Sequence, residues 1–143
     1  VVAMLERRHL ARLMAELSGD FIADLDQAIA AVEAGTSFNL IHRGTYLKVD
    51  VFPCLTPFDR EAARRAMEIV MPGGRECLRV ATREDILLAK LRWYRLGDET
   101  SEVQRRDIES LVALNRSEFD RTYLERWAEA LGVSDLLKRF FGP

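Results

Sequence analysis

The sequence predicts an α/β (α+β) protein, in which a small mixed sheet flanked by helices is followed by a helical C-terminal half. Apolar and polar residues alternate over 45–52, a period of two that is typical of a half-buried strand. After Ala81 the apolar residues recur at helical spacing to the end of the chain. The 143 residues are the length of one domain. We therefore predict a single domain over 1–143, with the sheet in 1–81 and helices in 82–143.

The first elements are expected to be helices around one short strand. Apolar spacing predicts a helix over 6–17 and a second one over 25–33. Residues 21–23 between them are expected to form the short strand. Asp24 has the residue type and position of an N-terminal cap for the second helix.

Two antiparallel strands are expected next, over 37–42 and 45–52, joined by a tight turn at Arg43-Gly44. This pairing would place Phe38–Ile41 beside Leu47–Phe52. The remaining elements are a helix over 56–67, strands over 68–71 and 77–80 joined by a hairpin at 72–75, and helices over 83–96, 101–115, 118–131 and 134–141. The aromatic residues Trp93, Tyr94, Trp127, Phe140 and Phe141 are expected to pack among the last helices.

Charge and apolar content exclude several classes of protein. The 21 basic and 23 acidic residues leave a net charge of -2, so non-specific nucleic-acid binding driven by charge is not expected. No apolar run approaches the roughly 20 residues that span a bilayer. We expect no membrane partner and a cytoplasmic location, with Cys54 and Cys77 as free and mostly buried thiols.

Lys48 and Asp50 are the most informative pair for function. Residues two apart on a strand point to the same side, about 6–7 Å from one another. A carboxylate held there can bind a divalent cation, which takes hard oxygen ligands. Alternatively, both side chains face solvent and pair with each other or with neighbours. Residue types leave both interpretations open.

Lys90 lies near the inward stripe of its predicted helix, where a lysine needs an anion or a path to water. Asp107 on the next helix is the expected partner, either in a structural ion pair or beside a bound phosphate. Asp24-Leu25-Asp26 has the spacing of a metal-binding Asp-x-Asp, but helix-forming residues follow it. We interpret Asp24 as a helix cap and Asp26 as a favourable first-turn acid.

Several segments, taken in order, resemble bacterial nucleotidyltransferase-fold proteins of the AbiEii-like and minimal-nucleotidyltransferase-like branch. The resemblance spans roughly 38–114. It rests on Ser37-Phe38-Asn39-Leu40-Ile41-His42, on Lys48-Val49-Asp50-Val51-Phe52, on Thr82-Arg83-Glu84-Asp85-Ile86-Leu87-Leu88-Ala89-Lys90-Leu91, and on Arg105-Arg106-Asp107-Ile108. It implies a small mixed sheet flanked by helices, often with a helical C-terminal part.

The same resemblance implies an activity. Active members transfer a nucleoside monophosphate from an NTP to a hydroxyl, using Mg²⁺ held by three carboxylates. Two of these come from an Asp-x-Asp/Glu strand preceded by a Gly-Ser or Gly-Gly helix start, and the third from a neighbouring strand. Asp50 matches the third, a catalytic and metal-binding carboxylate. Lys48, Lys90 and Asp107 would then belong to the nucleotide site, Lys90 approaching the triphosphate.

The Gly-Ser start and the Asp-x-Asp strand are not found in the sequence, so its status as an enzyme stays open. The motif strand could lie just upstream, with Val1-Val2-Ala3 as its tail. Nucleic acid would then be a partner only as the acceptor substrate. Alternatively, the protein is an inactive interaction module, such as a toxin–antitoxin component or a homodimer that uses its C-terminal helices. A weaker option is nucleic-acid contact through the arginines Arg60, Arg64, Arg65, Arg75 and Arg79.

Overall fold

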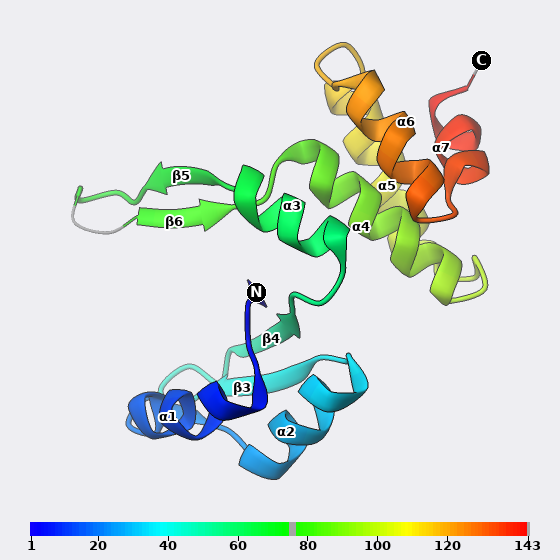
Figure 1. The fold of residues 1–143 in the computed structure, drawn as a ribbon. Helices are drawn as coiled ribbons and strands as arrows, with labels where there is room; N and C mark the ends of the chain where they lie inside the picture. Colours follow the sequence, from blue (N-terminus) through cyan, green and yellow to red (C-terminus); the bar gives the residue numbers. More distant parts are fainter. Residues whose placement is uncertain (75–76, 143) are drawn as a thin grey trace. The chain divides into compact units, whose positions relative to one another are not determined.

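The computed structural model describes residues 1–74 and 77–142, and its backbone forms two compact units, Val1–Arg64 and Arg65–Pro143 (Figure 1). Together they make a mixed α/β structure, as predicted. The elements that begin in the first unit are β1 (Val2–Ala3), α1 (Arg7–Leu17), β2 (Phe21–Ile22), α2 (Leu25–Ala34), β3 (Phe38–His42), β4 (Lys48–Pro53) and α3 (Pro57–Arg65). Those of the second are β5 (Met67–Val70), β6 (Cys77–Val80), α4 (Arg83–Leu96), α5 (Glu102–Asn115), α6 (Arg121–Ala130) and α7 (Ser134–Phe141).

The first unit is built on a four-stranded mixed sheet with the strand order β1-β4-β3-β2. β1 runs parallel to β4, whereas β3 runs antiparallel to both β4 and β2. Phe38 pairs with Val51, and Ile41 pairs with Lys48. The predicted antiparallel pairing of these two strands is therefore confirmed.

The connection between β3 and β4 is longer than the predicted turn at Arg43-Gly44. The His42 N–H donates to the Leu47 carbonyl at 2.9 Å, which leaves a four-residue loop over 43–46. Within the loop, the Thr45 N–H donates to His42 Nδ1 at 3.2 Å. Tyr46 takes a left-handed conformation, with φ of 56°, and β4 begins only at Lys48. The strand predicted over 45–52 is therefore wrong in its first three residues.

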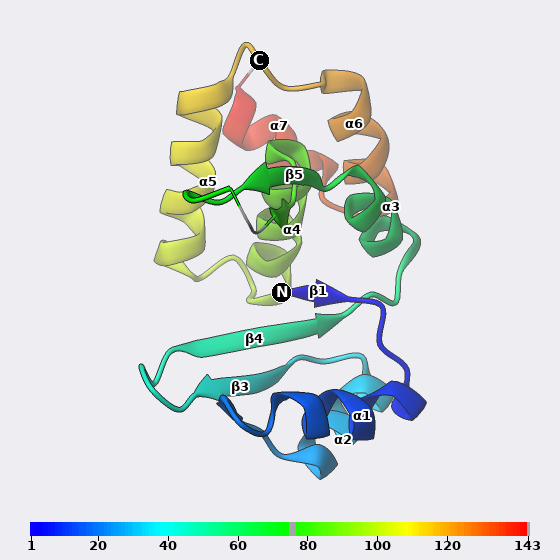
Figure 2. The same cartoon turned by 90° about the vertical axis from the view of Figure 1, so that its left-hand side faces the viewer.

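The core of the first unit lies on one face of the sheet. Alternate residues Phe38, Leu40 and Val51 are buried there, against Leu10 of α1 and side chains of α2. Figures 1 and 2 show α1 and α2 on this face of β3 and β4. The other face therefore carries the residues between these buried positions, and its exposed members are Asn39, Ile41, Lys48 and Asp50.

The second unit combines a two-stranded hairpin with four helices. In the hairpin, Met67 pairs with Val80 and Ile69 pairs with Leu78 (Figure 1). The predicted connection over 72–75 includes Arg75, which lies outside the described residues. The helices enclose a core of fully or nearly fully buried side chains: Leu87, Leu88, Leu91, Ile108, Val112, Leu124, Leu136, Leu137 and Phe141.

A buried acidic cluster joins α4 to α6. The Asp85 side chain is 1% exposed and accepts hydrogen bonds from the Thr82 hydroxyl at 2.7 Å and the Tyr123 hydroxyl at 2.6 Å. The guanidinium of Arg65 lies 3.7 Å from the centre of the Tyr123 ring and forms ion pairs with Asp85 and Glu84. The Asp120 N–H donates to Glu84 Oε1 at 3.3 Å, so Arg65, the two hydroxyls and this backbone donor compensate the buried negative charge.

Several predicted boundaries shift for local reasons. The helix predicted over 56–67 ends at Arg65, because Met67 joins β5. The helix predicted over 118–131 begins at Arg121, because the Asp120 side chain accepts from the Tyr123 N–H at 2.9 Å and caps it.

Two expectations of burial are wrong. Trp93 is 47% exposed, because α4 turns Leu87, Leu91 and Tyr94 inward and leaves Trp93 beside that stripe. Cys77 is exposed on β6, and Cys54 is half-buried. Burial, followed by the charge of Asp59, raises the pKa of the Cys54 thiol. No described helix is long and apolar enough to cross a membrane.

Candidate functional site

Lys48 and Asp50 lie together on the exposed face of the sheet, as the alternation predicted. Their neighbours Val49 and Val51 point to the core side and fix the direction of β4. Lys48 Nζ is 3.2 Å from Asp50 Oδ1, and the two side chains are 60% and 48% exposed. An ion pair this exposed contributes at most about 1 kcal/mol, so a ligand of Asp50 could displace Lys48 at small cost.

β3 adds two side chains to the same face. Asn39 is the register partner of Asp50, and Ile41 is the partner of Lys48. Both are exposed. Asn39 was not among the predicted site residues, although an amide between the apolar residues Phe38 and Leu40 indicates the exposed face of the strand.

β1 ends beside Asp50. The Val1 ammonium donates to the Asp50 carbonyl at 2.6 Å, and the Phe52 N–H donates to the Val1 carbonyl at 2.8 Å. These two bonds align Val1 with Val51, in agreement with the pairing of Val2 with Phe52. A residue directly before Val1 that continued this strand would therefore be aligned with Asp50.

Lys90 and Asp107 form the predicted ion pair between α4 and α5. Lys90 Nζ is 2.5 Å from Asp107 Oδ2. Their side chains are 26% and 46% exposed, so the Lys90 side chain is mostly buried against its neighbours. The structure thus brings together Lys48 with Asp50 in the first unit and Lys90 with Asp107 in the second.

The Asp24-Leu25-Asp26 segment behaves as predicted. The Asp24 side chain accepts from the Gln27 N–H at 3.0 Å and caps α2, and Asp26 lies in the first turn. No group of three or more metal-ligating side chains is found among residues 1–74 and 77–142. Asp50 alone, beside a lysine, does not fit a magnesium centre that needs three carboxylates.

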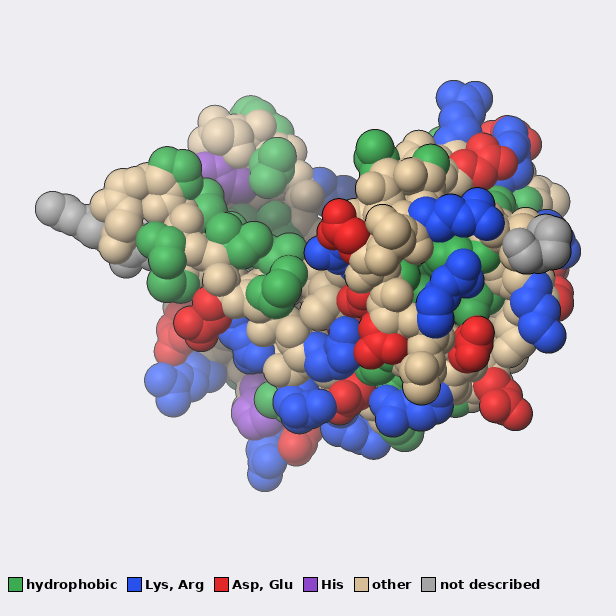
Figure 3. Space-filling view, turned by 90° about the horizontal axis from the view of Figure 1, so that it is seen from above, with side chains coloured by type: hydrophobic (Ala, Val, Ile, Leu, Met, Phe, Trp, Pro, Cys, Tyr) green, Lys and Arg blue, Asp and Glu red, His purple; other side chains and the backbone are tan. Residues whose placement is uncertain are grey.

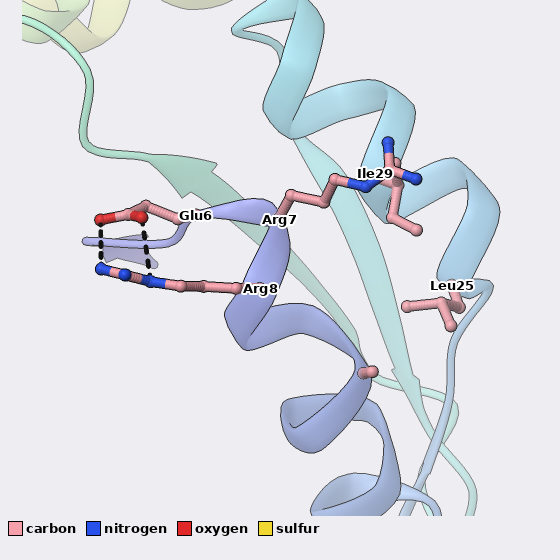
Figure 4. A pocket seen from close by; sticks show the side chains of 6 residues that line it. Glu6, Arg7, Arg8, Leu25 and Ile29 are labelled. Carbon is pink, nitrogen blue, oxygen red and sulfur yellow. Dashed lines mark hydrogen bonds and ion pairs between the residues drawn. The ribbon is translucent and has the colours of Figure 1, made fainter.

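A shallow hollow lies between α1 and α2, with the Glu6 and Arg8 side chains paired at its edge (Figure 4). It is lined by Glu6, Arg7, Arg8, Ala11, Leu25 and Ile29. None of these is a predicted site residue, and the helices that form it lie on the core side of the sheet. The hollow is therefore separate from the face that carries Asp50.

The arginines considered for nucleic-acid contact are engaged by nearby groups where the structure describes them. Arg60 donates to the Leu55 carbonyl, Arg64 pairs with Glu61, and Arg65 pairs with Glu84. Arg79 is the register partner of Glu68 in the hairpin. Arg75 lies outside the described residues.

Comparison of the chain with models of protein families, with curated proteins and with solved structures finds no match.

Proposed function

We propose that the protein is a nucleotidyltransferase, which transfers a nucleoside monophosphate from an NTP to a hydroxyl acceptor at the sheet face around Asp50. The observation that carries this proposal is the parallel pairing of β1 with β4. It supports the proposal because a strand that continued β1 back from Val1 would run beside Asp50, where the further carboxylates of a magnesium site are needed.

Neighbouring strands lie about 4.8 Å apart, and directly aligned residues point to the same face. The first residue before Val1 would be aligned with Asp50, and the third before Val1 with Lys48. An Asp-x-Asp at these positions would place two carboxylates on the face of Asp50. That would complete the set of three that Mg²⁺ needs.

The remaining charges have roles in this proposal. Lys48 balances the charge of Asp50 in the absence of a ligand, at 3.2 Å. Lys90 and Asp107, which belong to the second unit, enter the proposal through the family resemblance alone, as nucleotide-binding residues whose ion pair leaves Lys90 partly exposed to an anion.

The first test is the gene sequence upstream of Val1. A Gly-Ser or Gly-Gly turn followed by Asp-x-Asp at the join supports the enzyme, whereas a start codon at or near residue 1 supports a binding module. The second test is calorimetry of the full-length protein with Mg²⁺ and each of the four common NTPs. We expect Asp50→Asn to abolish Mg²⁺-dependent nucleotide binding and transfer and to leave the fold intact.

Lys90→Ala gives an independent check in the same assay. It should weaken nucleotide binding more than it lowers stability, since its partly exposed ion pair contributes at most about 1 kcal/mol to folding. Equal heats from wild type and Asp50→Asn, or no heat from either, would leave Asp50 as a structural remnant.

A second function, an inactive interaction module, is favoured by the β5–β6 hairpin. Met67, Ile69 and Leu78 are 51%, 46% and 51% exposed on one of its faces, and its hydrophobic side chains stand out in Figure 3. A two-stranded hairpin gains little stability alone in water, so cover by a protein partner or a second copy would stabilise it. Light scattering that shows a dimer for wild type and a monomer for Ile69→Asp would support this module.

A further inference from the structure

We infer that the β5–β6 hairpin binds a second copy of this chain edge to edge, with the two β5 strands antiparallel about a twofold axis at Ile69. This inference rests on the second of the two functions above, because it names the partner of the hairpin and the way in which the two bind. It is independent of the proposed nucleotide site.

The two strands of the hairpin are exposed along almost their whole length. All four residues of β5 are exposed, and so are the first three of β6. The strands pack chiefly on each other, and Figure 1 shows them extending away from α4. Among residues 1–74 and 77–142 no third strand pairs with them. A two-stranded sheet is marginal in water, whereas sheets of about four strands are common in stable domains. Two hairpins paired edge to edge make a sheet of that size.

The edge of β5 lacks the residues that usually protect an edge strand. Natural edges carry lysine, proline or a bulge, which prevents pairing with another chain. The strand Met67–Val70 contains neither lysine nor proline, and Val70 is 61% exposed on the face opposite to Ile69. Its single charge, Glu68, has Arg79 as register partner on β6, and opposite charges so placed stabilise each other. An apolar edge whose charge is already compensated favours pairing with a like strand.

The residues of β5 are self-complementary in one register. A twofold axis perpendicular to the sheet places one residue opposite its own copy and the flanking residues opposite each other. With the axis at Ile69, Met67 of each copy lies opposite Met71 of the other, and Met71 is also exposed. Glu68 then lies opposite Val70, so no two like charges are opposed. The paired row carries five residues from each copy, four of them apolar.

The neighbouring registers are less favourable. An axis at Glu68 would place two carboxylates directly opposite each other, which destabilises a pair of strands. An axis at Val70 would place Glu68 opposite Pro72, which has no N–H to donate to the ladder. The axis at Ile69 is therefore the one that the side chains of β5 support.

Single-cysteine crosslinking of the full-length protein tests this register. The background carries Cys54→Ser and Cys77→Ser, and either Ile69→Cys or Leu78→Cys is added to it. Leu78 is the matched control, because it is the register partner of Ile69 and the two side chains are 51% and 46% exposed. In the dimer, the two Cα atoms at position 69 would lie about 4.5–5.5 Å apart, within the reach of a disulfide. Those at position 78 would be three strand spacings apart, about 14 Å, which is too far.

With diamide as the oxidant, we expect Ile69→Cys to run as a covalent dimer on a non-reducing gel. Leu78→Cys should stay at the level of the background without a new cysteine. A short paired row belongs to the weak end of protein interfaces, so light scattering of wild type is run up to about 100 μM and should show twice the monomer mass. Far-UV circular dichroism of each variant shows that its fold is kept.

The outcomes separate this inference from the proposed functions. A dimer that Ile69→Asp dissociates, but in which Leu78→Cys crosslinks at least as fast as Ile69→Cys, overturns the β5 pairing alone. A dimer that Ile69→Asp leaves intact overturns the interaction module of the hairpin and this inference with it. A monomeric wild type, with both cysteine variants at background, overturns this inference, and any partner of the hairpin would then be a different protein. Nucleotidyl transfer is decided separately, by the calorimetry of Asp50→Asn.

Discussion

Replacing Tyr123 by Phe removes one hydroxyl from the buried acidic cluster and keeps the ring on which the Arg65 guanidinium lies. That hydroxyl donates to Asp85 Oδ1 at 2.6 Å, and the Asp85 side chain is 1% exposed. A hydrogen bond to a charged group contributes about 1.5–3 kcal/mol, and water cannot replace the lost donor at a buried atom. Asp85 keeps the Thr82 hydroxyl and Arg65 as partners on its other oxygen. We therefore expect a loss of about 2 kcal/mol, in the lower part of that range.

Urea unfolding followed by far-UV circular dichroism measures this loss. With a slope of about 1–3 kcal/mol/M, the midpoint of Tyr123→Phe should fall by roughly 1 M. Tyr94→Phe is the matched control, because the Tyr94 ring packs against Phe140 and its hydroxyl makes no hydrogen bond to any described residue. The control should change stability by less than about 0.5 kcal/mol. If the two variants unfold alike, Tyr123 does not compensate the Asp85 charge.

Two further perturbations test the second helix and the contact of α4 with α7. Asp24→Ala should lower stability by about 1 kcal/mol, because it removes the cap of α2. Asp24→Asn should lower it much less, because the Asn side chain can still accept the hydrogen bond from the Gln27 N–H. Thermal melts of both variants check this. The hydrogen bond from Arg95 holds the pKa of Asp135 below its usual range, so the pair stabilises the fold above about pH 4 and loses its effect as the pH falls through the lowered pKa. Asp135→Asn should therefore have a lower melting temperature than wild type at pH 7. If the two melting temperatures still differ by as much at about pH 2, this assignment is wrong.

The sheet face around Asp50 could be predicted in part. Alternation along β4 is a local signal, and it placed Lys48 and Asp50 on one exposed face. The place of Asn39 opposite Asp50 was not predicted, because it comes from the register of β3 on β4, which depends on the loop between them. That loop has four residues, and no local pattern revealed that Tyr46 would take a left-handed conformation.

The helices were likewise predictable where the signal is local. α4 begins and ends where expected, because Thr82 caps it and Gly97 follows it. The exposure of Trp93 was predictable from the buried stripe of Leu87, Leu91 and Tyr94, which Trp93 does not join. The prediction that Trp93 is buried rested on its aromatic side chain alone and was wrong. Thr82 is a local partner of Asp85, but Arg65 and Tyr123 come from α3 and α6, which are distant in sequence, so no pattern within α4 could identify them.

The pairing of β1 with β4 joins residues 49 positions apart, whereas β3 and β4 are joined by a four-residue loop. Short hairpins close within microseconds, but contacts distant in sequence must first overcome the entropy of closing a long loop. We therefore expect the β3–β4 hairpin to form early in folding and β1 to join it last. Hydrogen exchange would detect this order, with the Phe52 amide, which donates to Val1, becoming protected after the amides shared by β3 and β4. In a newly synthesised chain, most of the sheet would therefore form while the edge of β4 that carries Asp50 is still unpaired, before β1 adds to it.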